Sequence, residues 1–227
     1  MEDIEIKKTA SLSEEHFNRT ADIYYEAWLD VLKNEFTRRT DEAIRDIVRA
    51  QFRSRSLMFP EGQLSAYHHG LNKVIGNISS LRVDDIYLFK SWNILTSSGY
   101  FYTHNNNGKH IVCPAVNTDR EIHKLGIRGV AKRLVLSARD VTVSLKEQGL
   151  EKMFVYTRPS GYGPYVKKYG DTPIEKYFDN KMDGHKEFPD AIDLHLGLGA
   201  KIIKPVENAR PADKSSLGYC VIMEYEI

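Results

Sequence analysis

The sequence predicts a single mixed α/β domain. Its 227 residues suit one large domain, and 41% hydrophobic with 28% charged residues lies near the average of globular proteins. Stretches with the period of strands alternate with stretches of helical period, and no linker rich in proline or glycine separates them. We therefore expect one domain over residues 1–227 with a full hydrophobic core.

The N-terminal part predicts a strand followed by two helices. Apolar and polar residues alternate over 4–9, as in a half-buried strand. Ser11 and Glu14 have the spacing of a capping box, and apolar residues recur at helical spacing over 13–33. Thr40 is suited to cap a second helix.

A hairpin and a long aromatic segment follow. Residues 63–68 and 73–83 have the period of strands and are joined by a turn that contains glycine. Residues 84–102 are too long for a plain connection, so we expect them to form a substrate wall together with Tyr24 and Trp28. Core packing is the alternative for these aromatic side chains.

The second half alternates strands and helices in an order that matters for function. The expected elements are a strand at 110–116, a helix that opens at 126–131 and ends at Gly149, a strand at 152–157, an excursion rich in glycine and tyrosine at 159–187, a helix at 191–198, and strands at 200–206 and 218–227.

Composition excludes several classes of function. The formal net charge of +1 provides no excess of basic residues to neutralise nucleic-acid phosphates or anionic lipid. No apolar run is long enough to span a bilayer, the start is acidic, and the two cysteines, Cys113 and Cys220, form no disulfide framework. We expect a cytoplasmic protein with no metal, because no cysteine or histidine pair has the spacing of a zinc site.

A glycine-containing loop before a helix is the strongest local signal. Glycines at this place let backbone N–H groups converge, and the helix N-terminus adds partial positive charge, so such a loop can hold a pyrophosphate. A plain turn is the alternative. Walker and dinucleotide motifs are excluded by their missing residues. The candidate ligand-binding residues are Gly126, Ile127, Arg128, Gly129, Val130 and Ala131.

The order of elements around this loop resembles the GCN5-related N-acetyltransferase (GNAT) superfamily. The run Gly129-Val130-Ala131-Lys132-Arg133-Leu134-Val135 is similar to the Gly-x-Gly/Ala-x-x-Leu part of its signature. The resemblance implies a central, mostly antiparallel sheet flanked by helices and a site for acetyl-CoA or another acyl-CoA such as malonyl-CoA. Gly126 stands where the family has Arg or Gln, so Arg128 and Lys132 are the cations left for the pyrophosphate.

The same resemblance implies roles for two other segments. The strand residues Val112, Cys113, Ala115 and Val116 match the strand whose backbone pairs with the pantetheine arm, and Pro114 suits a strand that splays from its neighbour. His195 stands on the segment where the family has a Tyr that protonates the CoA thiolate. A histidine can donate or accept a proton near neutrality.

Residues 109–227 most resemble the GNAT-like domains of polyketide loading modules and of nitrilase fusions. In the polyketide group a Thr and a His act on malonyl-CoA and an Arg binds its carboxylate, and the matching positions are Thr157, His195 and Arg210. The alternatives are a packed Thr157, a half-exposed His195 and a solvated Arg210.

The resemblance therefore implies an enzyme that transfers an acyl group to a small-molecule amine or a carrier-protein thiol. The acyl-CoA would bind to 109–227 and the acceptor to the N-terminal half. One alternative is a malonyl-CoA decarboxylase that loads an acyl carrier protein, and another is a non-catalytic acyl-CoA sensor. A homodimer is left open.

Overall fold

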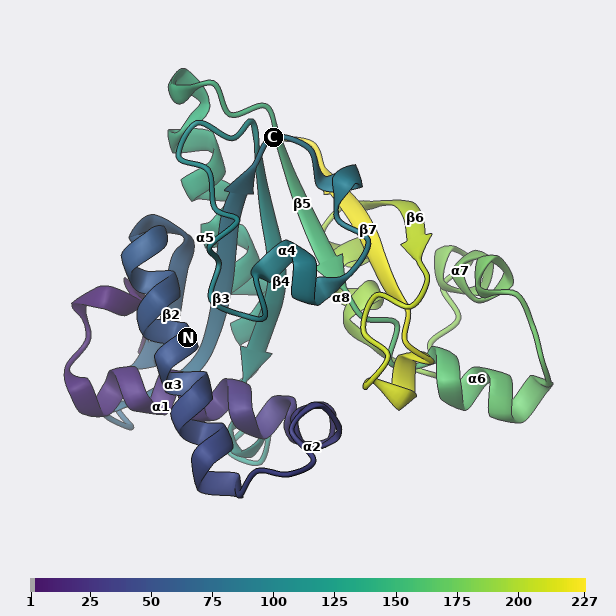
Figure 1. The fold of residues 1–227 in the computed structure, drawn as a ribbon, viewed down its shortest axis with the longest axis horizontal. Coiled ribbons are helices and arrows are strands. Elements are labelled where there is room, and N and C mark those ends of the chain that lie inside the picture. The colour runs from purple at the N-terminus through teal and green to yellow at the C-terminus, as the bar shows by residue number, and fades with distance from the viewer. Residues whose placement is uncertain (1–2) are drawn as a thin grey trace.

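The computed structural model describes residues 3–227 and is built on a seven-stranded sheet (Figure 1). The strand order is β1-β2-β3-β4-β5-β7-β6, and only β4 and β5 pair in parallel. The strands are β1 (Ile4–Lys8), β2 (Gln63–His68), β3 (Lys73–Val83), β4 (His110–Thr118), β5 (Lys152–Thr157), β6 (Lys201–Val206) and β7 (Cys220–Tyr225). The predicted mixed α/β fold with a mostly antiparallel sheet is confirmed.

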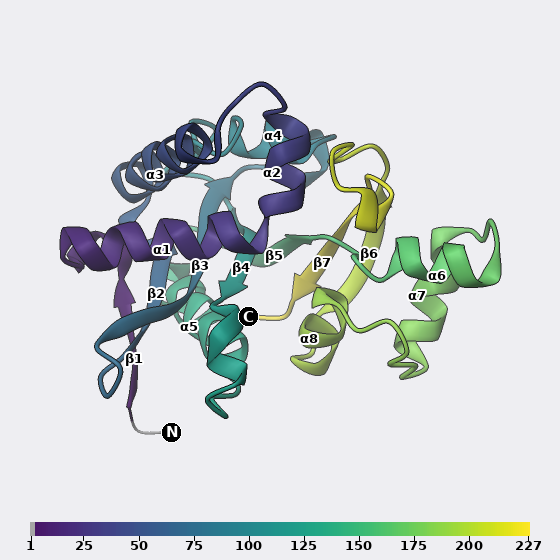
Figure 2. The ribbon, with the colours of Figure 1, turned by 90° about the horizontal axis from the view of Figure 1, so that it is seen from below.

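Helices cover both faces of the sheet (Figure 2). Helices α1 to α4 lie over one face, α5 and α8 lie over the other, and α6 and α7 lie beyond the edge strand β6. The helices are α1 (Glu14–Ala27), α2 (Leu29–Glu35), α3 (Asp41–Met58), α4 (Trp92–Thr96), α5 (Val130–Ser144), α6 (Tyr162–Tyr169), α7 (Ile174–Met182) and α8 (Ala191–Gly197). None of the helices in residues 3–227 has both the length and the apolar character that crossing a membrane requires.

The core has two parts, one on each face of the sheet. Successive residues of a strand point to opposite faces, and β5 shows this directly. Met153 and Val155 join the cluster under α5, whereas Phe154 and Tyr156 join the cluster under α1 and α3. The sequence of β5 is mostly apolar without alternation because helices cover both faces of the sheet at this strand.

The first predicted helix is wrong in two respects. Ser13, not Ser11, is the N-cap, and its hydroxyl accepts a hydrogen bond from the His16 backbone N–H. The helix also breaks at Trp28, which has φ −112° and ψ 13°, so α1 and α2 replace one helix over 13–33. Trp28 donates its indole N–H to Asn117 at 2.8 Å, and a contact with so distant a strand leaves no periodic signal.

The excursion at 159–187 contains two helices that the sequence analysis did not predict. They pack through tyrosines, with the rings of Tyr165 and Tyr177 5.3 Å apart. The hairpin at 63–68 and 73–83 and the cap at Thr40 are confirmed. Both new helices have fewer than ten residues, too short for a periodic pattern to stand out.

Candidate active site

The sheet opens between its two parallel strands. Pairing between β4 and β5 runs from His110 and Lys152 to Cys113 and Val155 and then stops, although β4 continues to Thr118. Pro114 follows the last pair and has no N–H to donate to a neighbouring strand. The predicted splay is therefore present.

A cavity of about 290 Å³ lies at this opening. It is lined from both faces of the sheet, by Ala27 and Trp28 at the end of α1 and by Ala191 and His195 of α8. The remaining lining residues come mostly from the two strands: Ile78, Cys113, Pro114, Ala115, Val116, Asn117, Thr118, Arg120, Tyr156, Thr157 and Arg158. Val112, also expected to face pantetheine, packs in the core under α1 and α3 instead.

His195 is buried, with 2% of its surface exposed, so it is not the half-exposed residue of the alternative interpretation. Its Nδ1 lies 2.7 Å from the hydroxyl of Tyr225 in β7. Burial lowers its pKa to about 4, so the imidazole is neutral at physiological pH.

Helix α8 is held in place at its first residue by groups from α7. Asp190 and Asp193 form a capping box, and the buried Lys181 lies 2.6 Å from Asp193 and 3.5 Å from Asp190. The Tyr177 hydroxyl donates to Asp190 at 2.6 Å. The helix that carries His195 is therefore anchored by the unpredicted helix α7, and the anchoring residues had no recognisable spacing in the sequence.

Thr157 ends β5 and lines the same cavity as His195. Within residues 3–227 its hydroxyl makes no hydrogen bond, so it is available to a bound molecule. The structure thus brings together two of the three predicted catalytic residues.

Arg210 lies elsewhere. It is 2% exposed, so it is not a solvated loop charge, and its guanidinium donates to Glu35 at 2.9 and 3.2 Å. The rings of Trp28 and Trp92 lie 4.3 and 4.0 Å from it. Burial acts to lower the pKa of Arg210, but Tyr24 and Glu35 raise it overall.

Arg210 lines a second cavity of about 220 Å³. The part of segment 84–102 expected to form a substrate wall lines this second cavity through Trp92, Asn93 and Ser98, and Tyr24 lines it as well. In the part of the chain that the structure describes, none of these residues lines the cavity between β4 and β5. Of the residues predicted to form the substrate wall, Trp28 lines that cavity.

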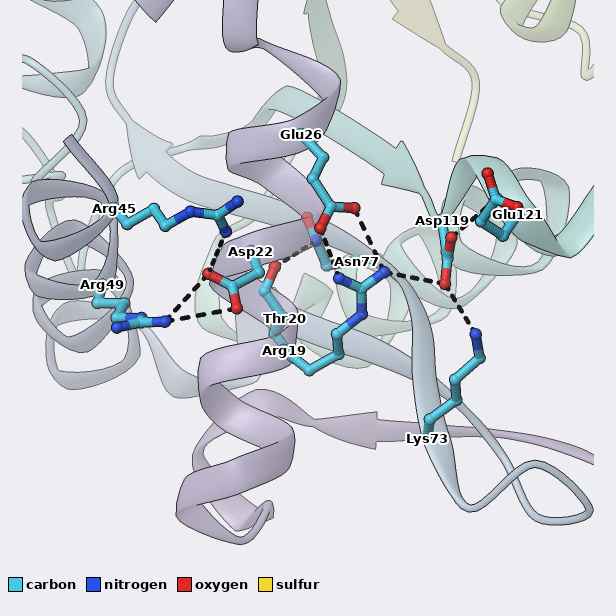
Figure 3. Close-up of polar contacts among 10 residues, drawn as sticks. All are labelled: Arg19, Thr20, Asp22, Glu26, Arg45, Arg49, Lys73, Asn77, Asp119 and Glu121. Carbon is cyan, nitrogen blue, oxygen red and sulfur yellow. Dashed lines mark hydrogen bonds and ion pairs between the residues drawn. The ribbon is translucent and has the colours of Figure 1, made fainter. Parts of the chain in front are cut away.

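A chain of amides fixes Trp28 at the cavity. Asn117 accepts from the indole and donates to Asn77 at 2.9 Å, and Asn77 donates to the Thr20 carbonyl at 3.0 Å. Figure 3 shows the Asn77 end of this chain beside α1. The guanidinium of Arg158 lies 4.6 Å from the Trp28 ring.

The glycine loop before α5 has an open backbone at both of its glycines. Gly126 and Gly129 have φ of +76° and +75°, a conformation that glycine adopts at little cost, and open space surrounds both. The N-terminus of the 15-residue helix α5 has no side-chain cap in the described chain, so no side chain of residues 3–227 competes with a ligand for its first N–H groups. Arg128, which the sequence analysis expected to face the pyrophosphate, donates to the His123 carbonyl at 2.8 Å.

None of residues 126–131 lines the cavity, but the first residue of α5 lies near Asn117, which does. Gly76 of β3 lies between the two elements: a Cβ at this position would be 2.9 Å from the carbonyl of Asn117 in β4 and 3.0 Å from the side chain of Val130 in α5. The start of α5 therefore lies close to the end of β4. Asn117 is itself a lining residue of the cavity.

Asp119 anchors the connection between β4 and this loop (Figure 3). Its carboxylate, 2% exposed, lies 2.9 Å from Arg19 and 3.1 Å from Lys73, and it accepts from the Glu121 backbone N–H. Desolvation acts to raise its pKa, but these partners lower it overall. The carboxylate therefore stays charged and ties the start of the connection to α1 and β3.

Neither cysteine is a nucleophile. Burial raises the pKa of Cys113 and of Cys220 to about 12, so both remain protonated thiols. No group of three or more histidine, cysteine or acidic side chains in residues 3–227 could hold a metal ion.

No family model matches the sequence. Over 169 residues the chain is 24% identical to the probable hydrolase YhcX of Bacillus subtilis, which covers 74% of this chain. The chain spans only 31% of the length of that protein.

Solved structures are similar over almost the whole chain. The loading GNATL domain of CurA from Lyngbya majuscula is 21% identical, with a TM-score of 0.63, and 98% of this chain and 97% of that chain are covered. The GphF GNAT-like decarboxylase, solved with isobutyryl-CoA, is 19% identical, with a TM-score of 0.67 and the same coverage. An aminoglycoside 6'-N-acetyltransferase solved with coenzyme A is 13% identical, with a TM-score of 0.54 and coverage of 97% and 96%.

Proposed function

We propose that this chain, which has the fold of the GCN5-related N-acetyltransferases, is an acyl-CoA-dependent acyltransferase. The acyl group of acetyl-CoA or a related acyl-CoA passes to an amine or thiol by direct attack on the thioester. The observation that carries this proposal is the cavity between β4 and β5, with Thr157 and His195 in its wall.

The groups around the cavity suit the parts of an acyl-CoA. The N-terminus of α5 behind Gly129 offers N–H groups to the pyrophosphate. The end of β4, which beyond Cys113 is paired with β3 but no longer with β5, offers backbone groups to the pantetheine arm. His195 and Thr157 are the groups placed to act at the thioester. The acceptor then enters on the side of Trp28, in the N-terminal half.

A decarboxylating loader of a carrier protein is the second candidate. Arg120 and Arg158 line the cavity and no carboxylate does so in the described chain, so a negatively charged acyl group is compatible with it. Arg210, matched to the carboxylate-binding Arg by resemblance, is paired with Glu35 outside this cavity. The carboxylate would therefore have to bind Arg120, or compete with Asp213 for Arg158 or with Glu35 for Arg210.

The decisive experiment incubates the protein with acetyl-CoA and malonyl-CoA in turn and follows free CoA, CO₂ and acylated acceptors by mass spectrometry. CoA release from acetyl-CoA with an amine or a thiol supports the acyltransferase. CO₂ from malonyl-CoA with an acetylated carrier protein supports the second candidate. Binding of CoA without turnover of either compound would contradict both and support a sensor.

The control is His195→Phe. We expect it to retain CoA affinity and to lose about 10²-fold or more in turnover, the usual scale of acid-base catalysis. Unchanged turnover would refute the role of His195.

A further inference from the structure

The hydroxyl of Tyr225 is the hydrogen-bond partner of the imidazole of His195, and Tyr225 is not among the residues that line the cavity. The two side chains are each 2% exposed, and their rings meet edge to face at 6.0 Å. The 2.7 Å contact between Tyr225 and Nδ1 joins β7 to α8. Nδ1 is therefore occupied, and Nε2 is the ring nitrogen left for the cavity.

In the hydrogen bond between Tyr225 and His195 either group could be the donor, and the burial of both groups decides which one it is. If Nδ1–H donated, the phenol hydrogen would be left with no acceptor, because the Tyr225 hydroxyl makes no other hydrogen bond in residues 3–227. A buried donor without an acceptor is costly. If the phenol donates to an unprotonated Nδ1, both groups are satisfied.

We propose that Tyr225 is a positioning residue that donates to Nδ1 of His195 and so keeps the hydrogen of the neutral imidazole on Nε2, facing the cavity. This inference rests on the proposed function, because it assigns the state in which His195 meets the acyl-CoA. Desolvation raises the pKa of Tyr225, so the phenol keeps its proton.

The consequence is that the polar side chains assigned to the cavity chemistry are hydrogen-bond donors. Nε2–H of His195 acts beside the hydroxyl of Thr157 and the guanidinium groups of Arg120 and Arg158, and no acidic residue is among the lining residues described. The Nε2–H of His195 then donates a hydrogen bond to an atom that gains negative charge, the thioester oxygen or the departing sulfur, and the imidazole keeps this proton. The proton that the acceptor loses passes to the departing CoA thiolate, which leaves as the thiol.

The direct test is the tautomer of His195, read from two-bond ¹H–¹⁵N correlations in the full-length protein at pH 7. We expect hydrogen on Nε2 in the wild type. Hydrogen on Nδ1 would overturn the proposal without any variant being needed. Because this readout requires no turnover, a protein with the expected tautomer and no acyltransferase activity would refute the proposed function and leave the positioning role intact.

The variant Tyr225→Phe removes the donor. We expect both tautomers to be populated, and kcat to fall about tenfold with KM for acetyl-CoA unchanged. Retention of a single Nε2–H tautomer and of the wild-type kcat would also overturn the proposal. The matched control is Tyr162→Phe, which loses a partly buried hydrogen bond to the Thr172 carbonyl, at a residue with no hydrogen bond or ring contact to His195. This control must leave the tautomer and kcat unchanged.

Discussion

At the scale of the residue, the chemistry depends on where side chains end up, not on their type alone. His195 and Arg210 are both buried, yet His195 has a ring nitrogen left for the cavity, whereas the guanidinium of Arg210 is held in an ion pair with the carboxylate of Glu35. Burial makes His195 neutral, and Glu35 keeps Arg210 charged. These two states follow from neighbours contributed by distant elements.

The neutral His195 predicts a pH dependence of stability. Its pKa is about 4 in the folded state and near 6.5 when unfolded, so between these values the unfolded chain binds the extra proton. The free energy of unfolding should therefore fall as pH decreases from 6.5 to 4, by up to about 3 kcal/mol from this group. Urea denaturation at pH 7, 5.5 and 4.5 measures it. His195→Gln should show a smaller fall, and an equal fall would contradict the assignment.

At the scale of the element, α5 and α8 are positioned by different means. The start of α5 depends on Asp119 and on two glycines with positive φ, whereas the start of α8 depends on its capping box and on Lys181 of α7. The loop before α5 is therefore open to a ligand, and the start of α8 is locked by ion pairs.

Gly129→Ala tests the loop. An alanine at φ +75° is strained by about 1–2 kcal/mol, and adjustment of the loop should weaken CoA binding about tenfold. Gly149→Ala is the matched control, since Gly149 has φ +82° and equally open space but lies at the other end of α5. Calorimetric titration with CoA measures the dissociation constant of each of the two variants. Equal affinities of the two variants would show that the loop does not contact CoA.

Lys181→Met tests the anchor of α8. It leaves Asp190 and Asp193 without their buried cation, which should cost about 3–5 kcal/mol of stability. In the variant that remains folded at low temperature, turnover should fall more than CoA affinity, because α8 carries His195 and not the phosphate loop. Lys168→Met, which removes an exposed pair with Glu187, should leave both the melting temperature and turnover unchanged. A melting temperature of Lys181→Met equal to that of this control would contradict the anchoring role.

At the scale of the whole molecule, the open sheet joins the two core clusters around one cavity. The cavity is lined from both faces, so a ligand inserted between β4 and β5 contacts both halves of the protein. Such a ligand should stabilise the fold as one unit.

CoA at 100 times its dissociation constant should add about 2.7 kcal/mol to the free energy of unfolding. For a chain of this length the melting temperature then rises by about 5–10 °C. Scanning calorimetry with and without CoA measures the shift, and His195→Phe should keep it because its CoA affinity is intact. No shift at millimolar CoA would argue against a coenzyme A site.

Local patterns in the sequence predicted most elements and part of the site. The hairpin, the cap at Thr40 and the glycine loop before α5 each depend on residues close in sequence, and the resemblance placed Thr157 and His195 on segments that line one cavity. The break at Trp28 was not predictable, because it accompanies a hydrogen bond to a residue 89 positions away. The helices α6 and α7 were not predicted, because they are too short for their apolar residues to show a clear helical period.

By itself the sequence determined the mixed α/β class and the glycine loop, because turn chemistry and periodicity are local properties, and the family resemblance pointed to His195 as the candidate histidine. Only the tertiary structure decided that Glu35 pairs with Arg210, that Tyr225 contacts His195 and that Lys181 holds α8. Each of these contacts joins residues on different elements, and burial makes it strong by removing the water that would otherwise compete for the same groups.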